Sequence, residues 1–292
     1  MARVLAISSQ VASGHVGLSA MVPALQALGH EVVALPTVLL SNHPGHGISA
    51  GAPVPPDQLS QVLEALGARG ELACVDAVIT GYLPTPEHIG CAADAIAATR
   101  AARPDHPPLI VCDPVCGDWP KGAYLPADVV DGLRDTLLPL ADALTPNVFE
   151  WALMTGDQTA ETTADTLALS PAEIAGTASS LRARHIVVTG LGLPHGANTV
   201  ETVWVDTAIG RTTSSRIARI AQVPNGTGDL LTALFAGYLL GPGEQAHALA
   251  RATAGVAAVL AASEGKSELQ LVAALPALTR APDVAEPAQQ NA

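Results

Sequence analysis

The sequence predicts an α/β fold in which one mostly parallel sheet is covered by helices on both faces. Short, largely apolar runs such as "RVLAIS" (3–8) and "LIVCD" (109–113) alternate with segments whose apolar residues recur at helical spacing. The runs show no polar face, as is typical of strands buried on both sides. The turns between them are short. Regular alternation of this kind favours parallel strands joined by crossover helices.

The first half of the chain contains four such strand–helix units. Polar or Gly/Pro-containing stretches separate the elements, and the longest of them is the loop "SNHPGHGISAGAPVPP" at 41–56. We expect strands at 3–8, 31–40, 75–80 and 109–113, and helices at 15–28, 57–66, 86–102 and 127–138.

The second half departs from this alternation after Gly190. A helix within 170–183 and a strand at 185–190 continue the pattern. The stretches "TVETVWVD" and "GRTTSSRIA" then predict a β-hairpin around 207–210, after which "NGTGD" begins the C-terminal helices. Neither a repeat nor a linker divides the chain, so we expect one domain over 1–281 and a flexible tail at 282–292.

Composition limits the classes of function. With 49% hydrophobic and 14% charged residues the chain is expected to pack as a globule. A formal charge of −13 disfavours nonspecific binding to nucleic acid or to an anionic membrane. The start of the chain has no signal-peptide pattern and no apolar run is long enough to span a bilayer. Four cysteines without a C-x-x-C pair are expected to be free thiols, so a cytoplasmic location is predicted.

Several polar residues fall at or just after the predicted strand ends. In a parallel α/β sheet the carboxyl ends of the strands share one edge, where ligands bind. One rim is therefore expected to gather these residues: Ser9, Gly81, Asp113, Asn147 and Thr189.

The segment "NGTGD" at 225–229 has the residues required for phosphoryl transfer to an alcohol. Gly226 and Gly228 permit backbone conformations in which neighbouring N–H groups converge, and the helix that follows points its positive end at the same place. Asp229 in the first turn could accept the proton of an attacking hydroxyl. The alternative is an ordinary Gly-rich turn before a helix with an acidic first turn.

Two further stretches supply acidic residues to the same rim. In "TPNVFE", Asn147 and Glu150 are three residues apart at a helix start, where they could hold a hydrated Mg²⁺ or form a capping box. In "VCDPVCGD", Asp113 ends a strand and Asp118 lies in the following loop. Their alternative role is simple strand-end and turn chemistry.

The resemblance to other nucleotide-binding motifs fails on spacing. "GKS" at 265–267 has Leu260 where a P-loop needs glycine, and "GLGLPHG" at 190–196 has the wrong glycine spacing for a dinucleotide site. His43 and His46 lack the further ligands that a metal site requires.

The ordered set "ISSQVASGHVGLSA", "SNHPGHG", "ITGYL", "CDPVCGD", "TPNVFE" and "NGTGD" resembles the pyridoxal kinases of the ribokinase superfamily. The resemblance extends from Val4 to about Leu275. It implies a ribokinase-like three-layer α/β/α fold, ATP and Mg²⁺ as cofactors, a monovalent cation (K⁺ or Na⁺), and a homodimer. The "GTGD" and "N-x-x-E" motifs mark the superfamily, whereas "SSQVASGHVG" and "SNH" point to the pyridoxal branch.

The resemblance also implies a role for each matching residue. Asp229 matches the catalytic base, and Gly226, Thr227 and Gly228 match the anion hole. The residues that match the substrate pocket are Ser9, Tyr82, His43 and Pro44. Those that match the nucleotide side are Asp113, Asp118, Tyr124, Thr145, Asn147, Thr189, Ser215, Arg216, Ile217 and Ala218, the last four in a flexible segment beside the adenine. Asp113 and Glu150 match the positions that organise the cation. The loops around 117–126 and 42–51 are candidate covers that exclude water.

Two positions depart from the family pattern. Pro44 stands where the family has threonine, and a proline can donate no hydrogen bond. Gly190 replaces a longer side chain on the nucleotide side. Because Pro44 weakens the case for a pyridine substrate, a hydroxymethylpyrimidine kinase remains an alternative. So does a vitamer-binding protein that does not catalyse.

Overall fold

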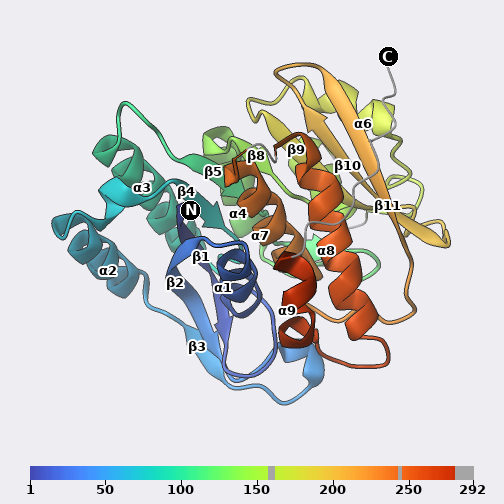
Figure 1. The fold of residues 1–292 in the computed structure, drawn as a ribbon, viewed down its shortest axis with the longest axis horizontal. Coiled ribbons are helices and arrows are strands. Elements are labelled where there is room, and N and C mark those ends of the chain that lie inside the picture. The colour runs from blue at the N-terminus through green and yellow to red at the C-terminus, as the bar shows by residue number, and fades with distance from the viewer. Residues whose placement is uncertain (157–161, 243–244, 280–292) are drawn as a thin grey trace.

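The computed structural model describes residues 1–156, 162–242 and 245–279, and the predicted tail at 282–292 lies outside them. The described chain forms one sheet with helices on both faces (Figure 1). The strand order is β11-β10-β9-β8-β5-β4-β1-β2-β3. The bounds are β1 (Arg3–Val11), β2 (Glu31–Leu40), β3 (Gly51–Pro53), β4 (Ala77–Thr80), β5 (Leu109–Cys112), β8 (Ala143–Leu144), β9 (His185–Leu191), β10 (Thr199–Asp206) and β11 (Arg211–Ala218).

The strands from β2 to β9 in this order are parallel, whereas both edges of the sheet are antiparallel. At one edge β10 and β11 form the predicted hairpin beside β9. At the other edge β3 pairs with the end of β2. The mostly parallel sheet is therefore confirmed. A separate two-stranded hairpin, β6 (Gly117–Asp118) and β7 (Gly122–Ala123), lies beyond the end of β5.

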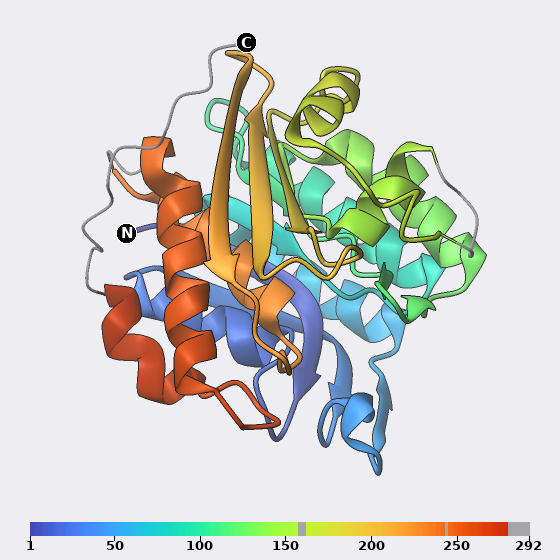
Figure 2. The same ribbon diagram turned by 90° about the vertical axis from the view of Figure 1, so that its right-hand side faces the viewer.

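Helices cover the sheet as two layers, which Figure 2 shows from the side. One layer contains α1 (Leu18–Ala27), α7 (Thr227–Leu240), α8 (Ala248–Ala262) and α9 (Leu271–Thr279). The other contains α2 (Pro56–Ala68), α3 (Pro86–Ala102), α4 (Ala127–Gly132), α5 (Val148–Thr155) and α6 (Pro171–Ala178). Among these helices, none in the described chain is both long and apolar enough to cross a lipid bilayer.

Two separate cores, one on each face of the sheet, explain why the strands are almost wholly apolar. Along β1, Leu5 and Ile7 belong to the core beneath α2 and α3, whereas Val4 faces the core beneath α1 and α7. Because successive side chains of a strand point to opposite faces, every position of a doubly covered strand must be apolar.

Three elements differ from the sequence prediction. Helix α1 begins at Leu18 rather than at 15, because Gly17 has φ 53°, outside the helical region. The predicted loop at 41–56 contains β3, whose pairing with β2 depends on tertiary contact rather than on local composition. The helix expected over 127–138 leaves α-helical geometry after Gly132, and Pro139 has no N–H for the carbonyl of Asp135.

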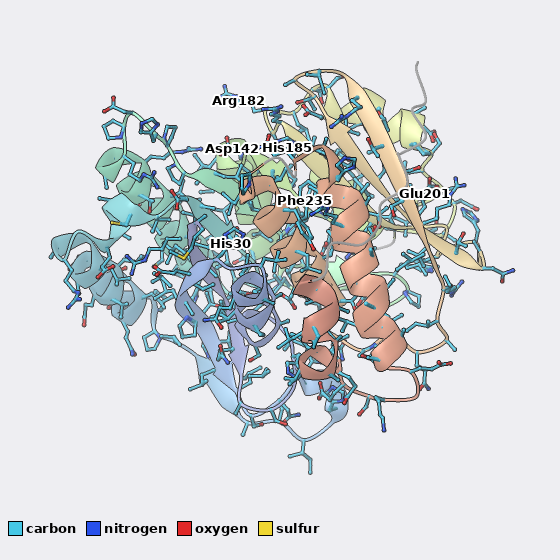
Figure 3. The ribbon with its side chains drawn as sticks, in the orientation of Figure 1. His30, Asp142, Arg182, His185, Glu201 and Phe235 are labelled. Carbon is cyan, nitrogen blue, oxygen red and sulfur yellow. The ribbon has the colours of Figure 1, made fainter. Side chains whose placement is uncertain are left out.

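Helix α7 is largely buried, since ten of its fourteen residues are buried. Phe235 is fully buried, and its ring meets Trp204 of β10 edge-on at 5.4 Å and His185 of β9 at 6.5 Å (Figure 3). Burial lowers the pKa of His185 to about 4, so this ring is neutral and packs as an aromatic side chain. These contacts fix α7, and with it the residues at its amino end, against the sheet.

Replacing Phe235 with alanine should therefore destabilise the protein by about 3–5 kcal/mol, because the cavity cannot collapse between α7 and the sheet. Val272 on α9 is 66% exposed and provides the control, since Val272→Ala should change stability by less than about 0.5 kcal/mol. Urea unfolding followed by circular dichroism measures both. A loss below about 1 kcal/mol for Phe235→Ala would contradict this account of the packing.

Candidate active site

The predicted rim is present at the carboxyl edge of the sheet. Main-chain hydrogen bonds continue the strand pairing at Gly81 and Asp113, which follow β4 and β5, and at Thr189, which lies within β9, whereas Ser9 lies within β1. Gly81 donates to Ile7 (2.9 Å), Asp113 to Thr80 (2.9 Å), and Thr189 to Pro146 (3.0 Å). Asn147 and Thr189 form a parallel bridge. Strand-end residues that are distant in sequence therefore lie side by side, as the sequence predicts.

The "NGTGD" segment forms the amino end of α7, also as predicted. Gly226 is the N-cap residue with φ 93°, a left-handed conformation that favours glycine. A Cβ at Gly226 would overlap the carbonyl oxygen of His15, so glycine is also required for space. The amides of Thr227, Gly228 and Asp229 open the helix, where N–H groups have no intrahelical partner. This end of α7 can bind an anion.

Asp229 lies in that first turn and is partly buried. Burial raises the pKa of its carboxyl to about 6, although a hydrogen bond from the main-chain amide of Gly17 opposes this shift. A carboxylate with a pKa near 6 is ionised at neutral pH and is a stronger base than an exposed aspartate. The geometry thus places an anion site and a base on one helix turn.

Asp113 lies near both Asp229 and Glu150, and the carboxylates of Asp113 and Glu150 are almost completely buried. Burial, then the charges of Glu150 and Asp229, raise the pKa of Asp113 well above its usual range. Burial also raises the pKa of Glu150 to about 7, although main-chain amides of Asn147, Cys116 and Gly117 oppose the shift. None of these three carboxylates forms an ion pair with a described lysine, arginine or histidine. Uncompensated negative charge of this kind fits a bound cation.

The alternative role of "TPNVFE" is confirmed as well. Asn147 and Glu150 form a capping box on α5: the Asn147 side chain accepts from the amide of Glu150 (3.0 Å), and the Glu150 carboxylate accepts from that of Asn147 (2.9 Å). The other oxygen of Glu150 accepts from the Cys116 amide (3.0 Å). Glu150 therefore orders the chain around the site, whatever else it binds.

The carboxylates of this site suit Mg²⁺, which is bound partly by water and phosphate, better than a metal ion that is coordinated by protein ligands alone. No group of three or more potential metal ligands occurs among the described residues. Mg²⁺ usually takes one or two carboxylates and completes its shell with water and substrate phosphates. Asp113 and Glu150 supply two carboxylates. In the hairpin above them, one oxygen of Asp118 pairs with Lys121 (3.1 Å), and the other is buried without a protein partner.

The residues predicted to line the substrate pocket lie on the β1 side of Asp229. Ser9 lies against Gly17, the residue whose amide contacts Asp229. The main chain of Tyr82 is fixed from both sides, by Ser8 (3.1 Å) and by Thr37 (2.7 Å).

His43 and Pro44 lie in the 41–50 loop on the same side. His43 caps a 3₁₀ turn that starts at Pro44, accepting from the amide of Gly45 (3.0 Å). The residue that departs from the family pattern is thus part of an ordered turn.

The predicted nucleotide residues occupy the opposite side. Thr145 lies beside Thr232 of α7, with 2.8 Å between their hydroxyl oxygens. Tyr124 follows the β6–β7 hairpin and is half exposed. Residues 215–218 form the end of β11, an ordered edge strand instead of the flexible segment that the resemblance implies. Its pairing with β10 explains the difference.

The end of β11 borders a pocket of about 220 Å³ against α8. Ser215 contacts Thr253 of α8 (2.7 Å), whereas Arg216 pairs with Glu201 of β10 (3.1 Å) on the other face of the strand. The pocket is lined by Ile217, Ala218, Ile220, Ala257, Leu260, Ala261 and Glu264. Its largely apolar lining is of the kind that an aromatic ring can enter.

Sequence reasoning missed two residues of the site. Thr232 donates to Asp113 (3.0 Å) and so stabilises its charged form. It lies three residues after Asp229, and this helical spacing was the one signal that could have identified it. Gly17, whose amide contacts Asp229, ends the "SSQVASGHVG" motif, but the motif does not predict this contact, because it joins segments more than two hundred residues apart.

Comparison with known proteins agrees with this geometry. Residues 12–270 match the family model described as phosphomethylpyrimidine kinase. The chain belongs to this family. A pyridoxal kinase (PdxY) of Leifsonia xyli is 36% identical over 277 residues, covering 92% of this chain and 93% of that protein. A pyridoxine/pyridoxal/pyridoxamine kinase of Bordetella bronchiseptica is 39% identical, covering 85% of each chain.

Solved structures give the same fold for members of this kinase family. The pyridoxal kinase of Leishmania donovani in complex with ADP and pyridoxine superposes with a TM-score of 0.81 at 25% identity, covering 95% of each chain. A putative phosphomethylpyrimidine kinase of Bacteroides thetaiotaomicron, crystallised with pyridoxal, has a TM-score of 0.85 at 23% identity and covers 99% of each chain. The ribokinase-like three-layer architecture is confirmed.

The raised pKa of Asp229 predicts that Asp229→Asn stabilises the folded protein at neutral pH by about 1–3 kcal/mol. Between the unfolded value near 3.8 and the folded value of about 6, the native state binds more protons, so wild-type stability falls as the pH rises through this window. The gain from the variant should grow over the same window and then stay constant to pH 8. Urea unfolding at several pH values measures it, with the exposed Asp94→Asn as control.

Proposed function

We propose that the protein transfers the γ-phosphoryl group of ATP to the 5′-hydroxymethyl group of pyridoxal, forming pyridoxal 5′-phosphate. The observation that carries this proposal is the position of Asp229, a base with a raised pKa, in the same first turn of α7 as the amides that can bind an anion. Similarity to the kinases of Leifsonia xyli and Bordetella bronchiseptica supports the choice of substrate.

In the proposed reaction Asp229 accepts the proton of the substrate hydroxyl as its oxygen bonds to the γ-phosphorus. The bond to the bridging oxygen breaks at the same centre, and ADP leaves. The amides of Gly226, Thr227 and Gly228 stabilise the charge on the transferring group. Each turnover therefore leaves one proton on Asp229, which must be released before the next.

Asp113 and Glu150 would hold Mg²⁺ beside the ATP phosphates, with Thr145 and Asn147 ordering them through the contacts described above. When bound, the ion neutralises phosphate charge. Burial of both carboxylates without a cationic partner supports this assignment. A monovalent cation, K⁺ or Na⁺, is proposed for the same negatively charged region.

The remaining predicted residues are assigned to two sides of the reacting phosphate. Ser9, Tyr82, His43 and Pro44 would contact the pyridine alcohol. Asp118, Tyr124, Thr189 and the end of β11 (215–218) would contact ATP, with the adenine in the pocket between β11 and α8. We also propose that the protein is a cytoplasmic homodimer, as its resemblance to pyridoxal kinases implies.

Hydroxymethylpyrimidine is the second candidate substrate. The matching family model is described as phosphomethylpyrimidine kinase, and Pro44 removes a side-chain donor from the loop next to the substrate. The same base and anion hole would serve a pyrimidine alcohol equally well.

Asp229→Asn should lower kcat about 100-fold to 10,000-fold while the KM values change little, because the base acts mainly in the transition state. In the wild type, kcat/KM should rise tenfold per pH unit up to about pH 6 and then level off, since the base must be ionised. Steady-state kinetics between pH 5 and 8 measures both, with Asp94→Asn as control. Unchanged turnover in Asp229→Asn would favour a vitamer-binding protein instead.

A substrate panel separates the two alcohols. ADP release should be faster with pyridoxal than with hydroxymethylpyrimidine at equal concentrations, by about tenfold or more in kcat/KM. If Pro44 weakens pyridoxal binding, Pro44→Thr should lower the KM for pyridoxal and leave that for ATP unchanged. Faster turnover of the pyrimidine alcohol would reverse the assignment of substrate.

A further inference from the structure

The 41–50 loop is a closed turn tied at its neck. Ser41 and Ala50 exchange hydrogen bonds, the Ser41 amide donating at 2.7 Å and the Ala50 amide at 2.9 Å. The Asn42 side chain spans the loop and donates to the carbonyls of His43 and Ile48 (3.1 Å each). These bonds fix the loop's internal shape, but they do not fix where its tip points.

The tip is held by a residue from the far end of the chain. The Nε2 of His46 lies 3.0 Å from a carboxylate oxygen of Glu268, in the segment between α8 and α9. Both side chains are about three-quarters buried, at 23% and 30% exposure, so the pair is shielded from water. Since a neutral imidazole can also donate from Nε2, the contact does not require a charged histidine.

The other oxygen of Glu268 packs on the β1–α1 connection. A Cβ at Gly14 would lie 2.6 Å from it, so the carboxylate fits only because Gly14 has no side chain. The neighbouring His15 carbonyl packs on Gly226, and Leu269 packs on the same glycine. Glu268 therefore joins the 41–50 loop to the segment that positions the amino end of α7.

The loop held in this way lies within range of the charges of the second candidate cover, the β6–β7 hairpin. His43 feels the charges of Lys121 and Asp118 in the β6–β7 hairpin, together with that of Glu268. On its other side Gly45 lies beside Asn225, the residue before Gly226. The tip of the loop is thus placed between the hairpin and the anion site.

We propose that Glu268 is a positioning residue for the phosphoryl-transfer reaction: by holding His46, it keeps the 43–47 turn closed over the catalytic end of the sheet. The closed turn raises affinity for the alcohol and keeps water from the γ-phosphoryl group. The inference rests on the proposed function, because the 41–50 loop is assigned there to the alcohol.

The variants Glu268→Ala, His46→Ala and the double variant test the pair. Asp131→Ala is the matched control, since Asp131 of α4 pairs with Arg134 in the segment that follows this helix (2.8 Å) and contacts neither loop. Each single variant should raise the KM for pyridoxal about five- to tenfold, leave the KM for ATP within twofold, and increase ATP hydrolysis per product formed. The double variant should resemble the single variants. Glu268→Gln, which still accepts from His46, should restore most of the affinity.

Amide hydrogen exchange gives a readout that is independent of turnover. Exchange over residues 43–50 should be at least tenfold faster in Glu268→Ala, while α7 and the sheet keep wild-type protection. Unchanged exchange, an unchanged KM for pyridoxal, or additive effects in the double variant would each overturn the proposal. If the wild type phosphorylates neither alcohol, the proposed function fails, and the exchange experiment still decides whether Glu268 holds the loop.

Discussion

Three carboxylates at the carboxyl edge of this sheet have no cationic partner among the described residues. Burial raises the pKa of Asp113, Glu150 and Asp229, and the charges of Glu150 and Asp229 raise that of Asp113 further; main-chain amides and Thr232, rather than a described lysine or arginine, contact them. Such an arrangement lowers the stability of the folded protein at neutral pH. This cost in stability is understandable if the ligand is a metal–nucleotide complex, because the metal ion then supplies the missing positive charge.

Backbone proximity, rather than side-chain contact, brings the active-site segments together. Gly226 lies directly on the His15 carbonyl, and Gly17 lies on Ser9 while its amide contacts Asp229. The approach of Gly226 to His15 and that of Gly17 to Ser9 are both too close for a residue with a Cβ. The β1–α1 connection therefore serves as a common support: it contacts the base, the anion-binding glycine and, through Gly14, the residue that holds the 41–50 loop.

Two candidate covers of different origin lie at this edge of the sheet. The β6–β7 hairpin follows β5, and the 41–50 loop follows β2, so they approach from different strands of the sheet. Both contain charged or polar side chains at their tips and both are anchored at their bases by hydrogen bonds. Phosphoryl transfer to an alcohol requires that water be kept from the phosphate, and two anchored loops can do this while still opening for substrate.

The sequence alone predicted the parallel sheet, the hairpin at its edge and the rim of polar residues, because the alternation of apolar strands and helices is a local pattern and parallel strands share one carboxyl edge. It also singled out Asp229 as a candidate base, because a carboxylate that follows two glycines at a helix start is a short motif. Tertiary structure decided what depends on packing between distant segments: the amide of Gly17 on Asp229, the hydroxyl of Thr232 on Asp113, and the contact of Glu268 with His46. Even where a motif was recognised, as in "TPNVFE", only the structure showed Glu150 accepting from amides on both of its oxygens, since burial and hydrogen bonding belong to the folded chain.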